Sequence, residues 1–148
     1  NDSFVREGFA LAPLFTSGSM YVTAFTQPYE ANTPGHAAMR ATFEAVGQNT
    51  GNLFVTAGWT SQYHLRDVLQ AAIKGGDLTR AGIRRAAANV NVSSDQMMPI
   101  KNLGQEGGQT ETYVGVPTAD NLSGISTLAW PYTGPTAAAK DWSAGPCS

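Results

Sequence analysis

The side chains that could carry out acid–base or nucleophilic chemistry are few in this sequence. His36 and His64 are the only histidines, and each stands near the start of an expected helix. Nothing nominates either ring as the base of a Ser/His/Asp triad, so both are interpreted as structural or solvated. The acidic residues are scattered, and no pair of them is marked for acid–base work. The sequence therefore predicts no catalytic residue, no metal site and no cofactor.

Phosphate-binding and thiol chemistry are equally unsupported. The glycine-rich run from Gly104 to Gly108 lacks the lysine and the strand–helix setting of a nucleotide-binding loop. Cys147 is the only cysteine, which rules out a disulfide within the chain and a zinc site built on several cysteines. Two readings of Cys147 stay open: a free thiol, or a cysteine that pairs with a segment outside this sequence.

One local pattern does suggest ligand binding, the run Ala57-Gly58-Trp59-Thr60-Ser61-Gln62. We expect the tryptophan at the junction between a short apolar segment and a helix that begins at Thr60 or Ser61. Helix N-termini attract polar and anionic groups through unpaired N–H donors, and an aromatic ring beside them adds an apolar wall. Trp59 is therefore a candidate ligand-binding residue. The alternative, that its ring only plugs the helix end into the core, also fits the pattern.

Length and composition narrow the class of protein. A chain of 148 residues suits one domain, and 42% hydrophobic with 14% charged residues excludes a disordered, highly charged tail. The net charge is −2, and the one basic cluster, Arg80, Arg84 and Arg85, is interpreted as a solvated helix face. Nucleic acid is therefore not expected as a partner. No apolar run reaches the roughly 18–20 residues of a membrane span.

Hydrophobic periodicity and capping residues predict four helices, near residues 3–14, 34–46, 61–74 and 79–89. Thr33 followed by Pro34 predicts the start of the second helix. The third helix should be the most buried, on a stripe formed by Leu65, Val68, Leu69 and Ile73. Short strands are expected at 20–25, 111–116 and 125–129.

The pattern divides the chain into three segments. Residues 1–25 hold a helix and a strand, residues 26–91 form an α/β segment, and residues 92–148 hold short strands and an irregular tail. The chain opens directly on a helix cap with no leader sequence. We therefore expect it to be the C-terminal part of a longer precursor.

Taken in order, these segments carry a family resemblance. The run Gly18-Ser-Met-Tyr-Val-Thr23, the helix after Pro34, the Ala57-Gly58-Trp59 start of a long helix and the run 76–83 follow one another with characteristic spacing. In this they resemble the C-terminal portion of the branched-chain amino acid (Leu/Ile/Val-type) substrate-binding proteins of bacterial ABC importers. The resemblance covers roughly residues 3–116, and it rests on the ordered set rather than on one diagnostic motif.

The resemblance implies an α/β fold that is part of a two-lobed, type I periplasmic-binding-protein architecture. Its helices would pack on a mostly parallel sheet. The resemblance also implies that residues 1–25 lead to a crossover between lobes, that 26–91 form an α/β lobe segment, and that 92–148 form a return crossover with short strands and an irregular tail. It implies a non-enzymatic, periplasmic or cell-surface protein that binds an amino acid or analogue. Its partners would be an ABC permease and the upstream segment of the same precursor. Trp59 matches an aromatic ligand contact of the family, and Asn1 and Asp2 match a loop that borders the ligand cleft.

Two other classes of function fit the residues. One is a fragment of an α/β hydrolase or amidase, in which His36 or His64 would act as the base. The other is a structural or assembly protein, which the low charge and the last third, rich in Thr, Gly and Ser, would suit.

Overall fold

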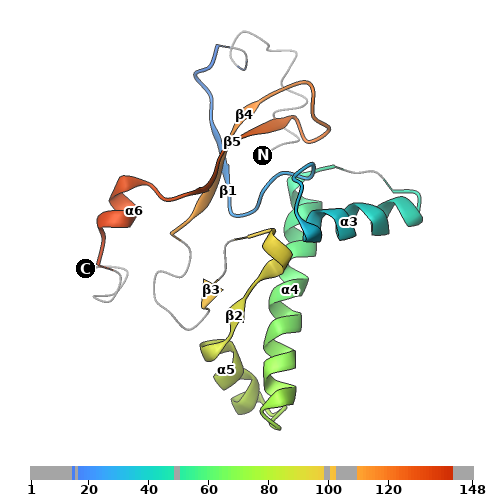
Figure 1. Ribbon diagram of the computed structural model, residues 1–148, viewed down its shortest axis with the longest axis vertical. Helices are drawn as coiled ribbons and strands as arrows, with labels where there is room; N and C mark the ends of the chain where they lie inside the picture. The colour runs from blue at the N-terminus through green and yellow to red at the C-terminus, as the bar shows by residue number, and fades with distance from the viewer. Residues whose placement is uncertain (1–14, 16, 49–50, 99–100, 103–109, 142–148) are drawn as a thin grey trace.

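A computed structural model describes residues 15, 17–48, 51–98, 101–102 and 110–141 (Figure 1). The helix expected over residues 3–14 lies outside this part of the chain. The described elements, in chain order, are β1 (Val22–Ala24), α3 (Pro34–Ala45), α4 (Leu53–Lys74), α5 (Arg80–Asn89), β2 (Asn91–Val92), the 3₁₀ turn η2 (Ser94–Gln96), β3 (Lys101–Asn102), β4 (Thr112–Pro117), β5 (Ile125–Tyr132) and α6 (Pro135–Ala139).

The chain is confirmed as an α/β protein, but its described strands pair differently from the expected parallel sheet. Three strands form a sheet in the order β1-β4-β5, and β2 pairs with β3; every one of these pairings is antiparallel. For β4 and β5 the reason lies in the connection, because the short turn 118–124 joins them. A parallel pair needs a crossover of a dozen residues or more. Phe15, Val22, Tyr113 and Ile125 form the core beside this sheet.

Helix α3 begins as the sequence predicts. Thr33 is the N-cap and its hydroxyl oxygen accepts a hydrogen bond from the His36 N–H, while Pro34 occupies the first turn. Proline fits there because its missing N–H would have no partner within the helix. The apolar side of α3 faces inward through Met39, which is completely buried.

Helix α4 begins well before the predicted start at Thr60 or Ser61. Its N-cap is Asn52, whose Oδ1 accepts a hydrogen bond from the Val55 N–H at 2.9 Å. Asparagine is among the best N-cap residues, and its cap starts the helix at Leu53. Gly58, which the sequence analysis placed just before the helix, is an interior helical residue; a single glycine costs a helix only about 1 kcal/mol.

The expected burial of the α4 stripe is only partly right. Val68 is buried and Leu69 half-buried, but Leu65 and Ile73 are 56% and 62% exposed. The periodicity of the stripe is real. What the sequence could not supply is which side of the helix faces the rest of the described chain.

The buried side of the first half of α4 is formed by Thr56, Thr60 and Tyr63. Threonine can be buried here because its hydroxyl finds a partner on the helix itself. Thr60 Oγ1 donates to the carbonyl of Thr56 at 2.7 Å, and Thr56 Oγ1 donates to the carbonyl of Asn52 at 3.3 Å. A hydroxyl that keeps a hydrogen bond loses little free energy on burial. Because threonine is polar, the hydrophobic pattern of the sequence does not reveal this buried side of α4.

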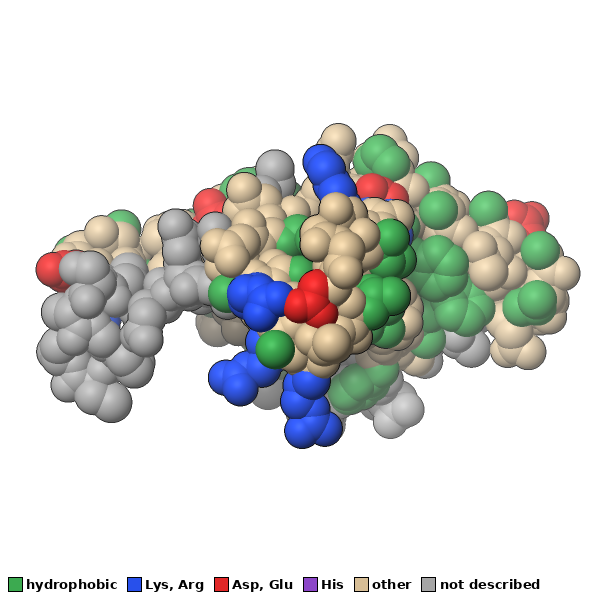
Figure 2. Space-filling model, turned by 90° about the horizontal axis from the view of Figure 1, so that it is seen from below, with side chains coloured by type: hydrophobic (Ala, Val, Ile, Leu, Met, Phe, Trp, Pro, Cys, Tyr) green, Lys and Arg blue, Asp and Glu red, His purple; other side chains and the backbone are tan. Residues whose placement is uncertain are grey.

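The turn between α4 and α5 matches the sequence prediction. Gly76 adopts φ +70°, a left-handed conformation that favours glycine after a helix end. Thr79 caps α5, and Asp77 accepts hydrogen bonds from both the hydroxyl and the N–H of Thr79. Those two bonds, and the neighbouring Arg85, lower the pKa of Asp77. Seen from below, basic side chains surround an acidic one at this end of the molecule (Figure 2).

The elements are arranged around α4. The sheet and α3 lie at its first turns, and the helix then runs away from the sheet, with α5 and the β2–β3 pair beside its second half (Figure 1). Within the described part of the chain, no helix is long and apolar enough to cross a lipid bilayer.

Candidate functional site

The loop between β1 and α3 is held in place by Arg40 of α3. One guanidinium nitrogen of Arg40 donates to the backbone carbonyls of Tyr29 at 2.7 Å and Ala31 at 2.9 Å. Hydrogen bonds from a charged donor are among the stronger ones in proteins. Arg40 therefore fixes the loop and, with it, the position of the Tyr29 side chain.

His36 fixes the same loop from a fully buried position. Its Nδ1 lies 2.7 Å from Thr33 Oγ1, and its Nε2 lies 3.4 Å from the carbonyl oxygen of Gln27. Burial lowers the pKa of His36 to about 4; the Gln27 carbonyl opposes this shift, and the charge of Arg40 adds to it. The ring is therefore neutral at pH 7, and its environment is that of a structural histidine, as predicted.

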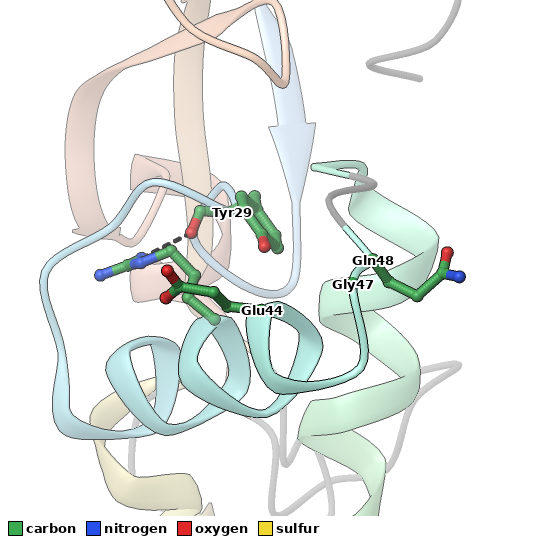
Figure 3. A pocket seen from close by; sticks show the side chains of 5 residues that line it. Tyr29, Glu44, Gly47 and Gln48 are labelled. Atoms are coloured by element: carbon green, nitrogen blue, oxygen red, sulfur yellow. Dashed lines mark hydrogen bonds between the residues drawn. The ribbon is translucent and has the colours of Figure 1, made fainter.

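A surface pocket of about 330 Å³ adjoins this loop. Its described lining residues are Tyr29 from the loop, Arg40 and Glu44 from α3, and Gly47 and Gln48 just after α3 (Figure 3). The volume is at the lower end of the range found for small-molecule sites. It would admit a ligand of roughly amino-acid size.

The pocket carries both signs of charge. Arg40 and Glu44 stand one helical turn apart on α3. The ion pairs found in the described residues join Arg66 to Asp67 and Asp95, and Arg85 to Asp77, so Glu44 takes part in none of them. The carboxylate of Glu44 is thus available to a cationic group, and the amide of Gln48 offers a donor and an acceptor. Chemically, the pocket suits a small ligand that is polar or charged.

Tyr29, which lines the pocket, also belongs to a compact hydrophobic cluster between α3 and α4. Its buried members are Tyr29, Met39, Tyr63 and Met97, and Phe43, Val55 and Trp59 pack against them. Met97 lies just after η2 and ties this cluster to the loop, because its carbonyl oxygen accepts a hydrogen bond from Thr26 Oγ1 at 3.0 Å. The hydrophobic cluster and the hydrogen bonds of Arg40 thus both hold Tyr29 in place.

Trp59 lies in this cluster, but the reason given for its ligand role is wrong in one respect. The residue is in the second turn of α4 rather than at a helix N-terminus. Its Nε1 donates to the Tyr63 hydroxyl at 3.3 Å, and its ring centroid lies 6.1 Å from that of Phe43. The residue is half-buried. Trp59 does not line the Tyr29 pocket, and its contact with a ligand stays a prediction.

The other predicted site residues, Asn1 and Asp2, lie outside the described residues, as does Cys147. Among the residues that the structure describes, no group of three or more His, Cys, Asp or Glu side chains could hold a metal ion.

The residues that form the pocket were not predicted from the sequence. Arg40 and Glu44 follow one another at the i, i+4 spacing of one helix face, and this was the available signal. No sequence pattern pointed to Tyr29, because its position depends on the hydrogen bonds that Arg40 donates to the loop.

A second missed contact joins the pocket loop to the sheet. The carboxylate of Glu30 accepts the N–H of Ser123 at 2.6 Å with one oxygen and the Ser123 hydroxyl at 2.6 Å with the other. Ser123 lies in the β4–β5 turn and is buried. This paired contact fastens the loop, and with it the helices, to the sheet.

The class of fold follows from this arrangement. The chain leaves a sheet at β1, forms a helical unit with a small polar pocket at its junction to the sheet, and returns to pair again at β4 and β5. This arrangement of helices and sheet is an α/β fold.

A solved structure with this arrangement is the fatty acid ABC transporter substrate-binding protein from Thermomonospora curvata. The similarity has a TM-score of 0.70 at 16% sequence identity and covers 84% of this chain. It supports the fold as part of a periplasmic-binding-protein architecture. The chain spans about a third of that protein, 33% of its length. No family model and no curated protein matches the sequence.

Proposed function

We propose that this chain is part of an extracytoplasmic solute-binding protein that delivers a small molecule to an ABC importer. The observation that carries the proposal is the fold similarity over 84% of the chain to a transporter substrate-binding protein. On this view the protein is not an enzyme, it works in the periplasm or at the cell surface, and its partners are a membrane permease and an upstream segment of the same precursor.

The ligand that we propose is an amino acid or a similarly small, polar compound of the Leu/Ile/Val-binding type. The size of the Tyr29 pocket and the opposite charges of Arg40 and Glu44 support a ligand with an ammonium and a carboxylate group. Trp59, with Asn1 and Asp2, is proposed to contact the ligand in the complete cleft. The solved relative is named for fatty acids, which makes a fatty acid the natural competitor in any binding test.

The test uses the protein as isolated from its source, after its intact mass has been measured. Titration calorimetry compares leucine, isoleucine and valine with a medium-chain fatty acid. We expect binding of an amino acid, weakened by about 1–3 kcal/mol in Trp59→Ala, the value of a buried aromatic contact. The matched control, Tyr21→Ala, removes an exposed aromatic of the sheet region and should bind as the parent does.

A second variant separates the two ligand classes. Glu44→Gln should weaken amino-acid binding, because the carboxylate that meets the ammonium group is lost, and should leave fatty-acid binding unchanged. Tight binding of the fatty acid without binding of an amino acid would show that the proposed ligand class is wrong and that the ligand is a fatty acid. Failure to bind any of these ligands, together with normal solute uptake in cells that lack the gene, would reject the binding-protein function.

A further inference from the structure

The turn that joins α4 to α5 concentrates positive charge. Four of the nine lysines and arginines of the chain fall within residues 73–85, together with a single acidic residue, Asp77. We call this segment the α4–α5 tip. Four positive charges against one negative charge give it a net charge of +3, whereas the whole chain has a net charge of −2. The tip lies at one end of the molecule's long axis, away from the sheet (Figure 1), and basic side chains stand out around an acidic one there (Figure 2).

The stability of the fold explains only two of the four basic residues. Arg85 forms an ion pair with Asp77, and Lys74 lies in the last turn of α4, where the helix dipole favours a positive charge. Arg80, by contrast, is the first residue of α5, where the dipole favours a negative charge, and it stands one helical turn before Arg84. Like charges at that spacing destabilise a helix. Since no ion pair among the described residues reaches Arg80 or Arg84, the fold gains nothing from placing them together.

Two exposed aliphatic side chains accompany the charges of the tip. Ile73 and Leu78 are 62% and 60% exposed. The turn that presents them is well defined, because Gly76 adopts its left-handed conformation and Asp77 accepts hydrogen bonds from the N–H and the hydroxyl of Thr79. A surface of this kind, cationic and aliphatic together, suits an anionic lipid bilayer. The headgroups attract the positive charges, and the aliphatic side chains reach the boundary with the acyl chains.

The make-up of the tip favours a bilayer over an acidic protein as the partner. The strongest contacts of protein interfaces centre on buried aromatic residues and arginine, and residues 73–85 contain no Trp, Tyr or Phe. The tip is also the narrow end of two helices joined by a short turn (Figure 1). A narrow end offers little area to a folded partner, whereas a charged membrane attracts each cation that comes near its surface.

We propose that the α4–α5 tip binds the anionic surface of a lipid bilayer. Lys74, Arg80 and Arg84 lie over the phosphate groups of the lipids, and Ile73 and Leu78 enter the region between the headgroups and the acyl chains. This contact goes beyond the proposed solute binding and does not depend on the identity of the solute. In a protein that delivers a solute to a membrane importer, it would hold the carrier at the membrane between deliveries.

Sedimentation with lipid vesicles tests the proposal. Parent and variants are purified whole from the source cells and mixed, without solute, with vesicles of equal parts phosphatidylglycerol and phosphatidylcholine or of phosphatidylcholine alone. The test variant combines Arg80→Gln with Arg84→Gln, both at exposed positions. The matched control combines Arg66→Gln with Lys140→Gln, which removes the same number of positive charges outside residues 73–85. Circular dichroism checks that each variant is folded.

We expect the parent to bind the phosphatidylglycerol vesicles at low salt, to be released by high salt, and to ignore phosphatidylcholine alone. The test variant should bind about 30-fold more weakly, at about fivefold per cation near an anionic surface. The matched control should bind as the parent does, and so should Arg80→Lys with Arg84→Lys, which keeps the charge. Leu78→Ser should weaken binding several-fold, because it removes apolar area without changing the charge.

Absence of binding to the anionic vesicles would overturn the proposal, and so would equal weakening by the matched control, which would make the effect one of net charge alone. If the parent binds polyglutamate but no vesicle, and the test variant loses that binding, the partner is an acidic protein surface instead. Titration calorimetry of the test variant with the solute gives a separate readout. It should match the parent, so a failed membrane contact and a failed solute-binding function are told apart.

Discussion

Lowering the pH from 7 to 5 should destabilise this protein through His36. Its ring is completely buried, its two nitrogens lie beside Thr33 Oγ1 and the Gln27 carbonyl, and its pKa is lowered to about 4 from 6.5. The unfolded chain therefore takes up a proton near pH 6.5, whereas the folded protein does so only near pH 4. The stability that neutral His36 contributes is fully present above the unfolded pKa and is lost as the pH falls through this window.

The size of the effect follows from the two pKa values. Between pH 7 and pH 5 the difference in proton binding amounts to about 2 kcal/mol of unfolding free energy, from about 1.4 kcal/mol per pKa unit. That is a large part of the stability of a typical domain, about 5–15 kcal/mol. Most carboxyl groups stay ionised at pH 5. They therefore contribute little to the change in unfolding free energy between pH 7 and pH 5.

Urea unfolding at pH 7 and at pH 5, followed by circular dichroism, measures this loss. His36→Gln should be less stable at pH 7, because it gives up the buried contacts, but should lose much less stability on going to pH 5. If His36→Gln and the parent show the same loss between the two pH values, the neutral, buried state assigned to His36 is wrong.

Two further predictions concern packing and the link between loop and sheet. Gly35→Ala places a Cβ 2.4 Å from Met97 Cγ and should cost about 1–3 kcal/mol through overpacking, whereas Gly58→Ala meets no atom and should gain about 0.5–1 kcal/mol as an alanine within a helix. Ser123→Ala removes one of the two hydrogen bonds to Glu30 and should cost about 1–3 kcal/mol, since the lost bond is made to the charged carboxylate of the half-buried Glu30.

Denaturant midpoints measure each of these changes. Equal changes in stability for the two glycine substitutions would show that the Met97 side chain moves aside without cost. A Ser123→Ala variant as stable as the parent would mean that water replaces the lost hydroxyl. Ser61→Ala is a suitable control for that variant, because its hydroxyl donates to the Gly58 carbonyl at an exposed position.

The sequence predicted most of what is local. Thr33 with Pro34 located the start of α3, and Gly76 with Thr79 located the boundary between α4 and α5, because caps and left-handed glycines act over a few residues. The start of α4 was missed because Asn52 lies in a turn-rich stretch, where a cap cannot be told from a loop residue. Strand positions were close to those observed at β1, β4 and β5.

What the sequence could not supply is long-range. Which side of α4 is buried depends on where α3 and η2 lie, and the burial of Thr56 and Thr60 has no hydrophobic signal. The pocket depends on Arg40 reaching two carbonyls of the preceding loop, and the Glu30–Ser123 contact joins segments far apart in the chain. Only the folded chain brings such pairs together.

The pairing of β1 with β4 bears on how this chain folds. Thr23 lies opposite Val114, about ninety residues further on, and closing a loop of that length costs on the order of 4 kcal/mol of chain entropy. Helices α3, α4 and α5 need only near neighbours, so they can form within the early collapse, while the sheet must wait for the chain ends to meet. Stopped-flow circular dichroism, which detects helix first, would show two kinetic stages, and the slower one would set the time for which the strand edges stay open to aggregation.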